Sequence, residues 1–161
     1  MSTDFERALE FVLVWEGGLV NDPADPGGRT AYGVTQRVYD GWLKARGQPT
    51  KDVYTISQAE VATIYQQFYW NPIMVGRTWP LNVVLFDTAV NMGVGRANEF
   101  LDAAKRLPVL PWQDRMTVLA GRVMTNRERY YRNLAAARPT LSKFLVGWLN
   151  RTAALRLLTN L

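Results

Sequence analysis

The sequence predicts a mainly α-helical domain with little strand. Over most of the 161-residue chain, apolar residues recur every three or four positions, which is the period of an amphipathic helix. Ser/Thr-x-x-Glu capping boxes, which mark helix starts, stand at 3–6 and 57–60. A chain of this length can also bury one substantial core. We therefore expect a single domain over residues 1–161.

The first predicted element is a helix over 5–16, because its apolar residues keep helical spacing. Gly17 follows at the position where a left-handed backbone commonly ends a helix. The next segment, 17–34, is rich in glycine and proline and is therefore predicted to be a long loop. Within this loop, 19–20 and 31–34 can form a short β-hairpin.

Further helices are predicted from apolar periodicity, from the capping residues Thr35 and Ser57, and from the stops at Pro72 and Pro139. One of them is nearly all apolar and is therefore predicted to lie buried at the centre of the fold. The expected helices cover 35–47, 57–70, 81–92 (the apolar one), 96–106, 112–137 and 140–158.

The chain contains neither cysteine nor histidine. This composition excludes disulfide frameworks, thiolate zinc sites, and Ser-His-Asp or Cys-His triads. Acid–base chemistry near neutral pH must then come from carboxylates, lysine or tyrosine.

The two halves of the chain differ in charge. Residues 1–80 carry a net charge of −2 and residues 81–161 a net charge of +7. This asymmetry favours an anionic partner for the second half, although a solvated basic face explains it equally well. Signatures of RRM, zinc-finger and basic-zipper proteins are absent, so we expect no nucleic-acid partner. We expect Arg122, Arg129 and Arg132 to form a basic stripe that binds an anionic wall polymer.

The N-terminus does not resemble a secretory signal. The acidic residues Asp4, Glu6 and Glu10 stand where a signal peptide has a basic region. No segment approaches the ~18 uninterrupted apolar residues that a membrane span needs. We therefore expect synthesis in the cytoplasm and no stable membrane insertion.

Glu16 and Asp25 are the candidate catalytic residues. Glu16 ends an amphipathic helix, and the negative end of the helix dipole, together with Trp15, should raise the pKa of its carboxyl. Asp25 lies in a loop whose backbone amides can keep a carboxylate ionised. Two carboxyls in different environments are what hydrolysis of a glycosidic bond requires. In the alternative, Glu16 pairs with Arg29 or caps the loop, and Asp25 forms an Asx turn with Pro26 and Gly27.

The block from Trp15 to Thr35 has a specific pattern. Glu-Gly-Gly follows an apolar helix, a Pro-rich loop contains Asp-Pro-Gly-Gly, and Tyr-Gly-Val-Thr closes the block. This pattern resembles the signature of glycoside hydrolase family 108, the lysozyme-like N-acetylmuramidases of bacteriophages and prophage regions. A weaker resemblance continues through 68–70 and 86–93 to 143–151, so it spans essentially the whole chain.

The resemblance implies a two-lobed, lysozyme-like fold. Residues 1–87 would form a catalytic helix-and-loop lobe, and residues 88–161 a helical, peptidoglycan-binding-like lobe. Glu16 would be the proton donor, with Asp25 and Thr30 completing the catalytic group. Asp22 is a rival for the second carboxylate.

Four residues are expected to bind substrate: Tyr32, Tyr69, Trp70 and Asn91. An aromatic face suits the apolar side of a pyranose ring, and the Asn91 side chain can bond a sugar amide. Core packing is the alternative for Tyr69 and Trp70. For Asn91, the alternatives are local capping and a bond to the Glu16 loop.

The activity that the resemblance implies is hydrolysis of the β-1,4 bond between N-acetylmuramic acid and N-acetylglucosamine in bacterial peptidoglycan, without cofactor or metal. The expected setting is host lysis by a phage or prophage endolysin. This endolysin would be a monomer, made in the host cytoplasm without a signal peptide and released to the cell wall in the periplasm by a holin-like membrane permeabiliser. A lytic transglycosylase and a non-catalytic wall-binding module are the alternatives.

Overall fold

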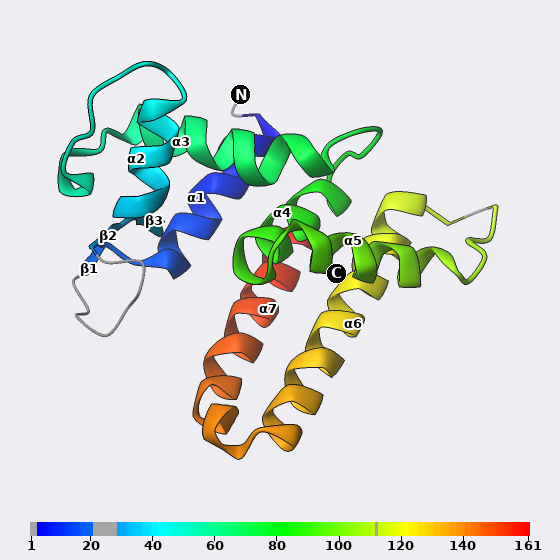
Figure 1. Cartoon of the computed structure of the whole chain (residues 1–161). Helices are drawn as coiled ribbons and strands as arrows, with labels where there is room; N and C mark the ends of the chain where they lie inside the picture. Colours follow the sequence, from blue (N-terminus) through cyan, green and yellow to red (C-terminus); the bar gives the residue numbers. More distant parts are fainter. Residues whose placement is uncertain (1–2, 21–28, 112) are drawn as a thin grey trace. The chain divides into compact units, whose positions relative to one another are not determined.

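The structure, a computed structural model, describes residues 3–20, 29–111 and 113–161, and it is mainly helical (Figure 1). The helices are α1 (Asp4–Glu16), α2 (Gln36–Lys44), α3 (Gln58–Tyr65), α4 (Leu81–Met92), α5 (Val94–Lys105), α6 (Arg115–Ala137) and α7 (Leu145–Thr159). Short 3₁₀ or π segments are η1 (Val53–Thr55), η2 (Gln66–Trp70), η3 (Asn71–Ile73) and η4 (Pro139–Phe144). The predicted fold class is confirmed.

The chain divides into two compact units. The first runs from Phe5 to Phe68, and the second comprises Tyr69–Leu161 with the N-terminal residues up to Asp4. The division therefore falls at 68/69 and not at the expected 87/88. The reason is that α4 packs against α5 and α6, so the whole of this apolar helix belongs to the helical unit.

A small antiparallel sheet follows α1 in the first unit. β1 (Leu19–Val20) pairs with β2 (Thr30–Ala31), which pairs with β3 (Val34–Thr35). The predicted hairpin is present in the pairing of β1 with β2, and the segment 31–34 contributes to two strands. Tyr32 and Gly33 both have positive φ, at 50° and 76°, so they form the two-residue turn of a hairpin.

The helices of the first unit begin where the sequence predicted. The Thr35 hydroxyl accepts the Val38 amide at the start of α2, and Ser57 and Glu60 form the predicted capping box of α3. The Tyr39 hydroxyl donates to the Glu60 carboxylate at 2.9 Å. Burial and this anionic neighbour raise the pKa of Tyr39 to about 12, so it remains a neutral donor.

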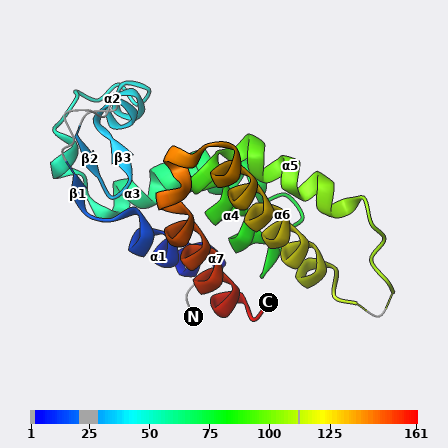
Figure 2. The same ribbon diagram turned by 90° about the horizontal axis from the view of Figure 1, so that it is seen from below.

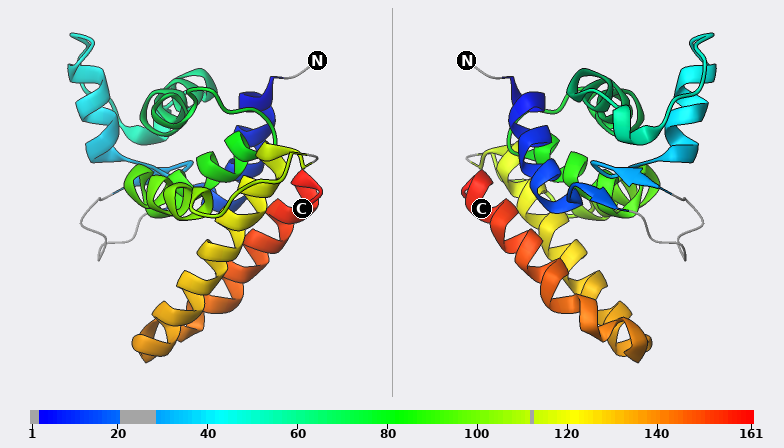
Figure 3. Two further views of the ribbon diagram at one scale, coloured as in Figure 1. Left: turned by 90° about the vertical axis from the view of Figure 1, so that its right-hand side faces the viewer. Right: turned by 90° about the vertical axis from the view of Figure 1, so that its left-hand side faces the viewer.

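Helix α4 forms the core of the second unit. Every residue from Leu81 to Ala89 is buried, which confirms the predicted central helix. α5 and α6 pack on it (Figure 2), and α6 and α7 run antiparallel beside one another, joined by η4 (Figure 3).

The helix starts after α4 differ from the expected ones, beginning with α5, which starts at Val94 and not at 96. α6 begins at Arg115, where the Asp114 carboxylate accepts the Thr117 amide at 2.7 Å. The expected start at 112 lies outside the described residues. α7 begins at Leu145 and not near 140, because the segment after Pro139 forms a 3₁₀ helix first.

An ion cluster lies inside the second unit. The Asp87 carboxylate of α4 binds the Arg127 guanidinium of α6 at 2.5 Å and the Arg151 guanidinium of α7 at 2.8 Å. Asp87 and Arg127 are fully buried. The two guanidinium groups hold the pKa of the Asp87 carboxyl below its usual range, against the opposing effect of burial.

None of the helices in the described part of the chain has both the length and the apolar character required for a membrane span.

We expect Asp87→Asn to lower the free energy of unfolding by about 3–5 kcal/mol, because it leaves two buried guanidinium groups without their counter-ion. The measurement is urea unfolding at pH 7. Asp102→Asn is the matched control, since the Asp102 carboxylate is 72% exposed and pairs with exposed Lys105 at 3.4 Å. The control should change stability by no more than about 0.5 kcal/mol. Equal effects of the two variants would contradict the role of the cluster.

The cost of Asp87→Asn should also depend on pH. The folded-state pKa of Asp87 is depressed, so its stabilisation is complete above the unfolded-state pKa of ~3.9 and is lost as pH falls through the folded-state value. Urea titrations between pH 7 and pH 3 compare the unfolding free energies of the wild type and Asp87→Asn. The difference between them should decrease only below about pH 4. If this difference in unfolding free energy already decreased above pH 5, the pH dependence would belong to another titrating group.

Candidate active site

Glu16 occupies the last residue of α1, and its side chain is half-buried. Gly17, at φ 75°, turns the chain out of the helix, as the sequence predicted. Because the cap is glycine, the chain can continue directly into β1 without the strain that a side chain would bring. The carboxyl is thus held at the junction between a helix and the small sheet.

The Glu16 side chain lies against the β2–β3 turn. A Cβ atom on Gly33 would stand 3.1 Å from Glu16 Cβ and 3.2 Å from Glu16 Cγ, and it would overlap the hydroxyl of Tyr65. Tyr65 is a buried residue of α3, and its hydroxyl donates to the Tyr32 carbonyl at 2.9 Å. Only glycine at position 33 therefore allows the helix end, the turn and α3 to meet.

Tyr32 and Thr30 lie on the same small sheet as this turn. The Tyr32 amide donates to the Gly18 carbonyl at 3.2 Å, which ties the turn to the residues that follow Glu16. Tyr32 is half-buried, and its φ of 50° is rare for a bulky residue. Strained backbone of this kind costs about 1–3 kcal/mol and persists where the surroundings enforce it. Thr30 is half-buried on β2, opposite Val20 in the β1–β2 register.

Asp25 and its rival Asp22 lie outside the described residues.

Arg29, the first described residue after that segment, is fixed by two partners. Its guanidinium pairs with the Asp52 carboxylate at 2.7 Å and lies 3.9 Å from the centre of the Tyr54 ring. The Tyr54 and Asp52 side chains together raise the pKa of Arg29. These contacts account for the charge of Arg29 without the alternative pairing to Glu16. The sequence did not predict Asp52 as the partner of Arg29, because the two residues are 23 positions apart.

The other predicted sugar contacts belong to the second unit. Trp70 is buried, and its ring packs edge-on against Phe86 at 5.3 Å, as the core-packing alternative expects. Tyr69 is half-buried and Asn91 is exposed. The side-chain oxygen Oδ1 of Asn91 accepts a hydrogen bond from the Tyr131 hydroxyl, a contact that links α4 to α6.

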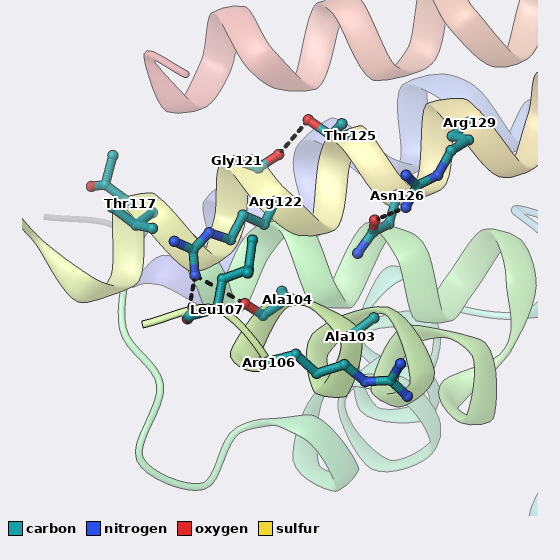
Figure 4. Close-up of a pocket in the computed structure, with 11 residues that line it drawn as sticks. Ala103, Ala104, Arg106, Leu107, Thr117, Gly121, Arg122, Thr125, Asn126 and Arg129 are labelled. Atoms are coloured by element: carbon teal, nitrogen blue, oxygen red, sulfur yellow. Dashed lines mark hydrogen bonds between the residues drawn. The ribbon is translucent and has the colours of Figure 1, made fainter. Parts of the chain in front are cut away.

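The expected stripe of arginines on α6 is only partly exposed. The Arg122 guanidinium donates to the carbonyls of Ala104, Leu107 and Pro108 and so caps the end of α5 (Figure 4). It lines an open cavity of about 620 Å³ between α5 and α6. Of the expected stripe, only Arg129 and Arg132 are exposed on the helix.

Among the residues that the structure describes, no three Asp, Glu, His or Cys side chains lie together as a metal site would require.

Comparison with known proteins assigns the family. The model of glycosyl hydrolase 108 matches residues 9–93, more than half of the chain and the segment that carries Glu16 and the turn. The chain belongs to glycosyl hydrolase family 108. Among solved structures, the one titled "Structure of Brucella abortus SagA" is similar to this chain, with 24% sequence identity. It superposes with a TM-score of 0.68 over 94% of this chain and 91% of that one. No curated protein matches the sequence.

This family 108 protein therefore has a lysozyme-like, mainly α fold and is a glycoside hydrolase that acts on peptidoglycan. The Glu16 block lies inside the segment that the family model matches. The contact of Gly33 with Tyr65 gives a physical reason for the glycine of the Tyr-Gly pair in this block.

Replacing Gly33 should disturb both stability and activity. Gly33→Ala introduces a strained φ and a Cβ that overlaps the Tyr65 hydroxyl, so the unfolding free energy should fall by at least about 2 kcal/mol. Cleavage of peptidoglycan should fall by about 10²-fold, because displacement of the turn also displaces Glu16.

Two glycines serve as controls in the same urea experiment. Gly17 has a similar φ, but a Cβ added there would meet open space. The unfolding free energy of Gly17→Ala should therefore fall by only ~1 kcal/mol, from backbone strain alone. Gly41→Ala lies inside α2 with open space and should gain about 0.5–1 kcal/mol. If Gly33→Ala cost no more than Gly17→Ala, the packing role of Gly33 would be refuted.

Proposed function

We propose that this protein is an N-acetylmuramidase that cleaves the β-1,4 bond between N-acetylmuramic acid and N-acetylglucosamine. The observation that carries the proposal is the placement of Glu16. Its half-buried carboxyl ends α1 and packs against a strained turn that the Tyr65 hydroxyl holds in place. Such a carboxyl keeps a fixed position relative to a bound glycan, as a general acid requires.

In the proposed reaction, Glu16 gives its proton to the glycosidic oxygen as the bond to the anomeric carbon breaks. Water adds to that carbon, and each cut leaves one new reducing end. Asp25 would supply the ionised carboxylate that stabilises the oxocarbenium-like transition state or directs the water, with Asp22 as the alternative. The Thr30 hydroxyl, on the strand that leads into the turn, would hold water or substrate near these carboxyls.

A lytic transglycosylase is the second candidate, since it needs a single glutamate and Glu16 is the carboxyl that packs against this turn. In that reaction the muramyl 6-hydroxyl, not water, attacks the anomeric carbon, and an anhydro-sugar forms. Mass spectrometry of digested muropeptides separates the two reactions, because hydrolysis adds one water per cut.

The proposed biological role is that of a phage or prophage endolysin. In this role the protein would act as a monomer on the wall of its host and reach the periplasm through a holin-like permeabiliser. The family match supports the peptidoglycan substrate, and the resemblance of residues 15–35 to phage muramidases supports the lytic role.

We expect Glu16→Gln to lower the rate of peptidoglycan cleavage by at least ~10²–10⁴-fold, because the amide cannot donate the proton that a general acid supplies. Release of reducing ends from purified peptidoglycan is the measurement. Glu10→Gln is the matched control, being an exposed residue on the same helix, and it should keep the wild-type rate. Retention of more than a tenth of the wild-type rate in Glu16→Gln would refute the assignment.

The second carboxylate is tested by Asp25→Asn and Asp22→Asn in the same assay. Asp25 precedes Pro-Gly-Gly, where glycines let backbone amides and substrate approach closely, so Asp25→Asn should lower turnover strongly and Asp22→Asn only mildly. The reverse ranking would transfer the role to Asp22 and leave the role of Glu16 intact.

A further inference from the structure

A cavity of about 270 Å³ opens on the surface of the second unit, between the end of α4, the start of α5, α6 and α7. Its volume lies just below the ~300–1,000 Å³ range of small-molecule sites, which fits one sugar unit. Its lining includes Asn91, Arg96, Tyr130, Tyr131 and Trp148. Neither the ion cluster nor the proposed chemistry of Glu16 explains this combination of aromatic and polar side chains.

The aromatic side of the cavity is rigid. The Tyr131 and Trp148 rings stack at 5.0 Å with 20° between their planes, and Tyr130 lies edge-on to Tyr131 at 6.4 Å. Sugars bind to such surfaces through their apolar C–H faces. Tyr131 is buried, so the half-buried Trp148 ring that stacks on it is the one that a ligand can contact, and this support means that little side-chain freedom of Trp148 is lost on binding.

The polar side of the cavity is linked to a local excess of positive charge. The ion cluster beneath it contains two guanidinium groups and a single carboxylate, that of Asp87. The Tyr131 hydroxyl accepts the Arg127 Nε–H at 2.9 Å and donates to the Asn91 carbonyl oxygen. Burial raises the pKa of Tyr131, so this hydroxyl remains a donor. With Oδ1 engaged by this hydroxyl, Asn91 can offer a ligand its Nδ2–H donors, and the net positive charge of the cluster favours an anion as their partner.

Arg96 supplies a second cationic group at the cavity. Its guanidinium lies 4.7 Å from the centre of the Tyr130 ring, which orients it, and it forms an ion pair with Glu99. Glu99 is 61% exposed, so this pair is weak and a carboxylate from a ligand can compete for the guanidinium. A planar guanidinium suits a carboxylate because it can donate two parallel hydrogen bonds.

We propose that this cavity binds a muramyl peptide, with the sugar against the half-buried Trp148 ring that Tyr131 supports and a carboxylate of the peptide stem between Asn91 and Arg96. The inference rests on the proposed function and specifies its substrate as the peptide-bearing glycan in preference to the bare one.

The test uses the full chain with Glu16→Gln, so that substrate is bound and not cut. The probes are a GlcNAc–MurNAc disaccharide carrying a tripeptide with free carboxylates and the same compound with those groups amidated. Calorimetry at physiological salt should give about 5- to 10-fold tighter binding of the carboxylate probe, because hydrogen bonds to charged groups are roughly twice as strong as neutral ones. Equal affinities would overturn the proposal.

Three added substitutions locate the effect. Arg96→Gln should reduce the preference to about twofold or less. Glu99→Gln removes the competing carboxylate and should tighten binding of the carboxylate probe alone. Trp148→Leu should weaken binding of both probes by a similar factor. Arg115→Gln, an exposed arginine at the start of α6 outside both the cavity lining and the expected basic stripe, is the control and should change neither affinity. A preference that survives Arg96→Gln would overturn the proposal, as would a loss in Arg115→Gln of the same size.

Failure of this inference can be distinguished from failure of the proposed function. Reducing ends released from peptidoglycan by the wild-type chain test the function, and probe affinities test the cavity. Hydrolysis without carboxylate preference would count against the cavity alone. Carboxylate preference without hydrolysis would support the cavity and count against the muramidase assignment.

Discussion

The carboxylate of Asp87 is the group on which the second unit depends. It lies midway along a helix whose first nine residues are all buried, where a lone charge would be prohibitively costly. Arg127 and Arg151 must therefore reach it, which fixes the register of α6 and α7 against α4. Because Arg127 also binds the Tyr131 hydroxyl, the same carboxylate indirectly orients the surface residue Asn91.

Local patterns were sufficient to predict most helices, whereas contacts between distant residues were not predictable. Gly17 and the Ser57 capping box act within a few residues, so their signals are complete in the sequence. The burial of Arg127 has no such signal. It stands among other arginines on α6, and what distinguishes it is a carboxylate forty residues earlier.

The candidate site divides in the same way. The Glu16 block was evident from its motif, and the structure adds how that motif is held. The hairpin was predictable, but the exact position of its turn at 32–33 was not, because the positive φ of Tyr32 is enforced from outside the segment. The Tyr65 hydroxyl that anchors this turn comes from α3, 33 residues along the chain. The conformational preferences of neighbouring residues cannot predict a contact between residues so far apart in the sequence.

The proximity of Gly33 and Tyr65 also constrains how this family can diverge. The hydroxyl of one residue occupies the volume in which the Cβ of the other would stand, so the two positions cannot drift independently. A lineage that replaced the glycine would first have to lose the hydroxyl at position 65 and find another donor for the carbonyl at position 32. The two positions should therefore covary when family 108 sequences are aligned, with no Cβ-bearing residue at 33 wherever tyrosine stands at 65.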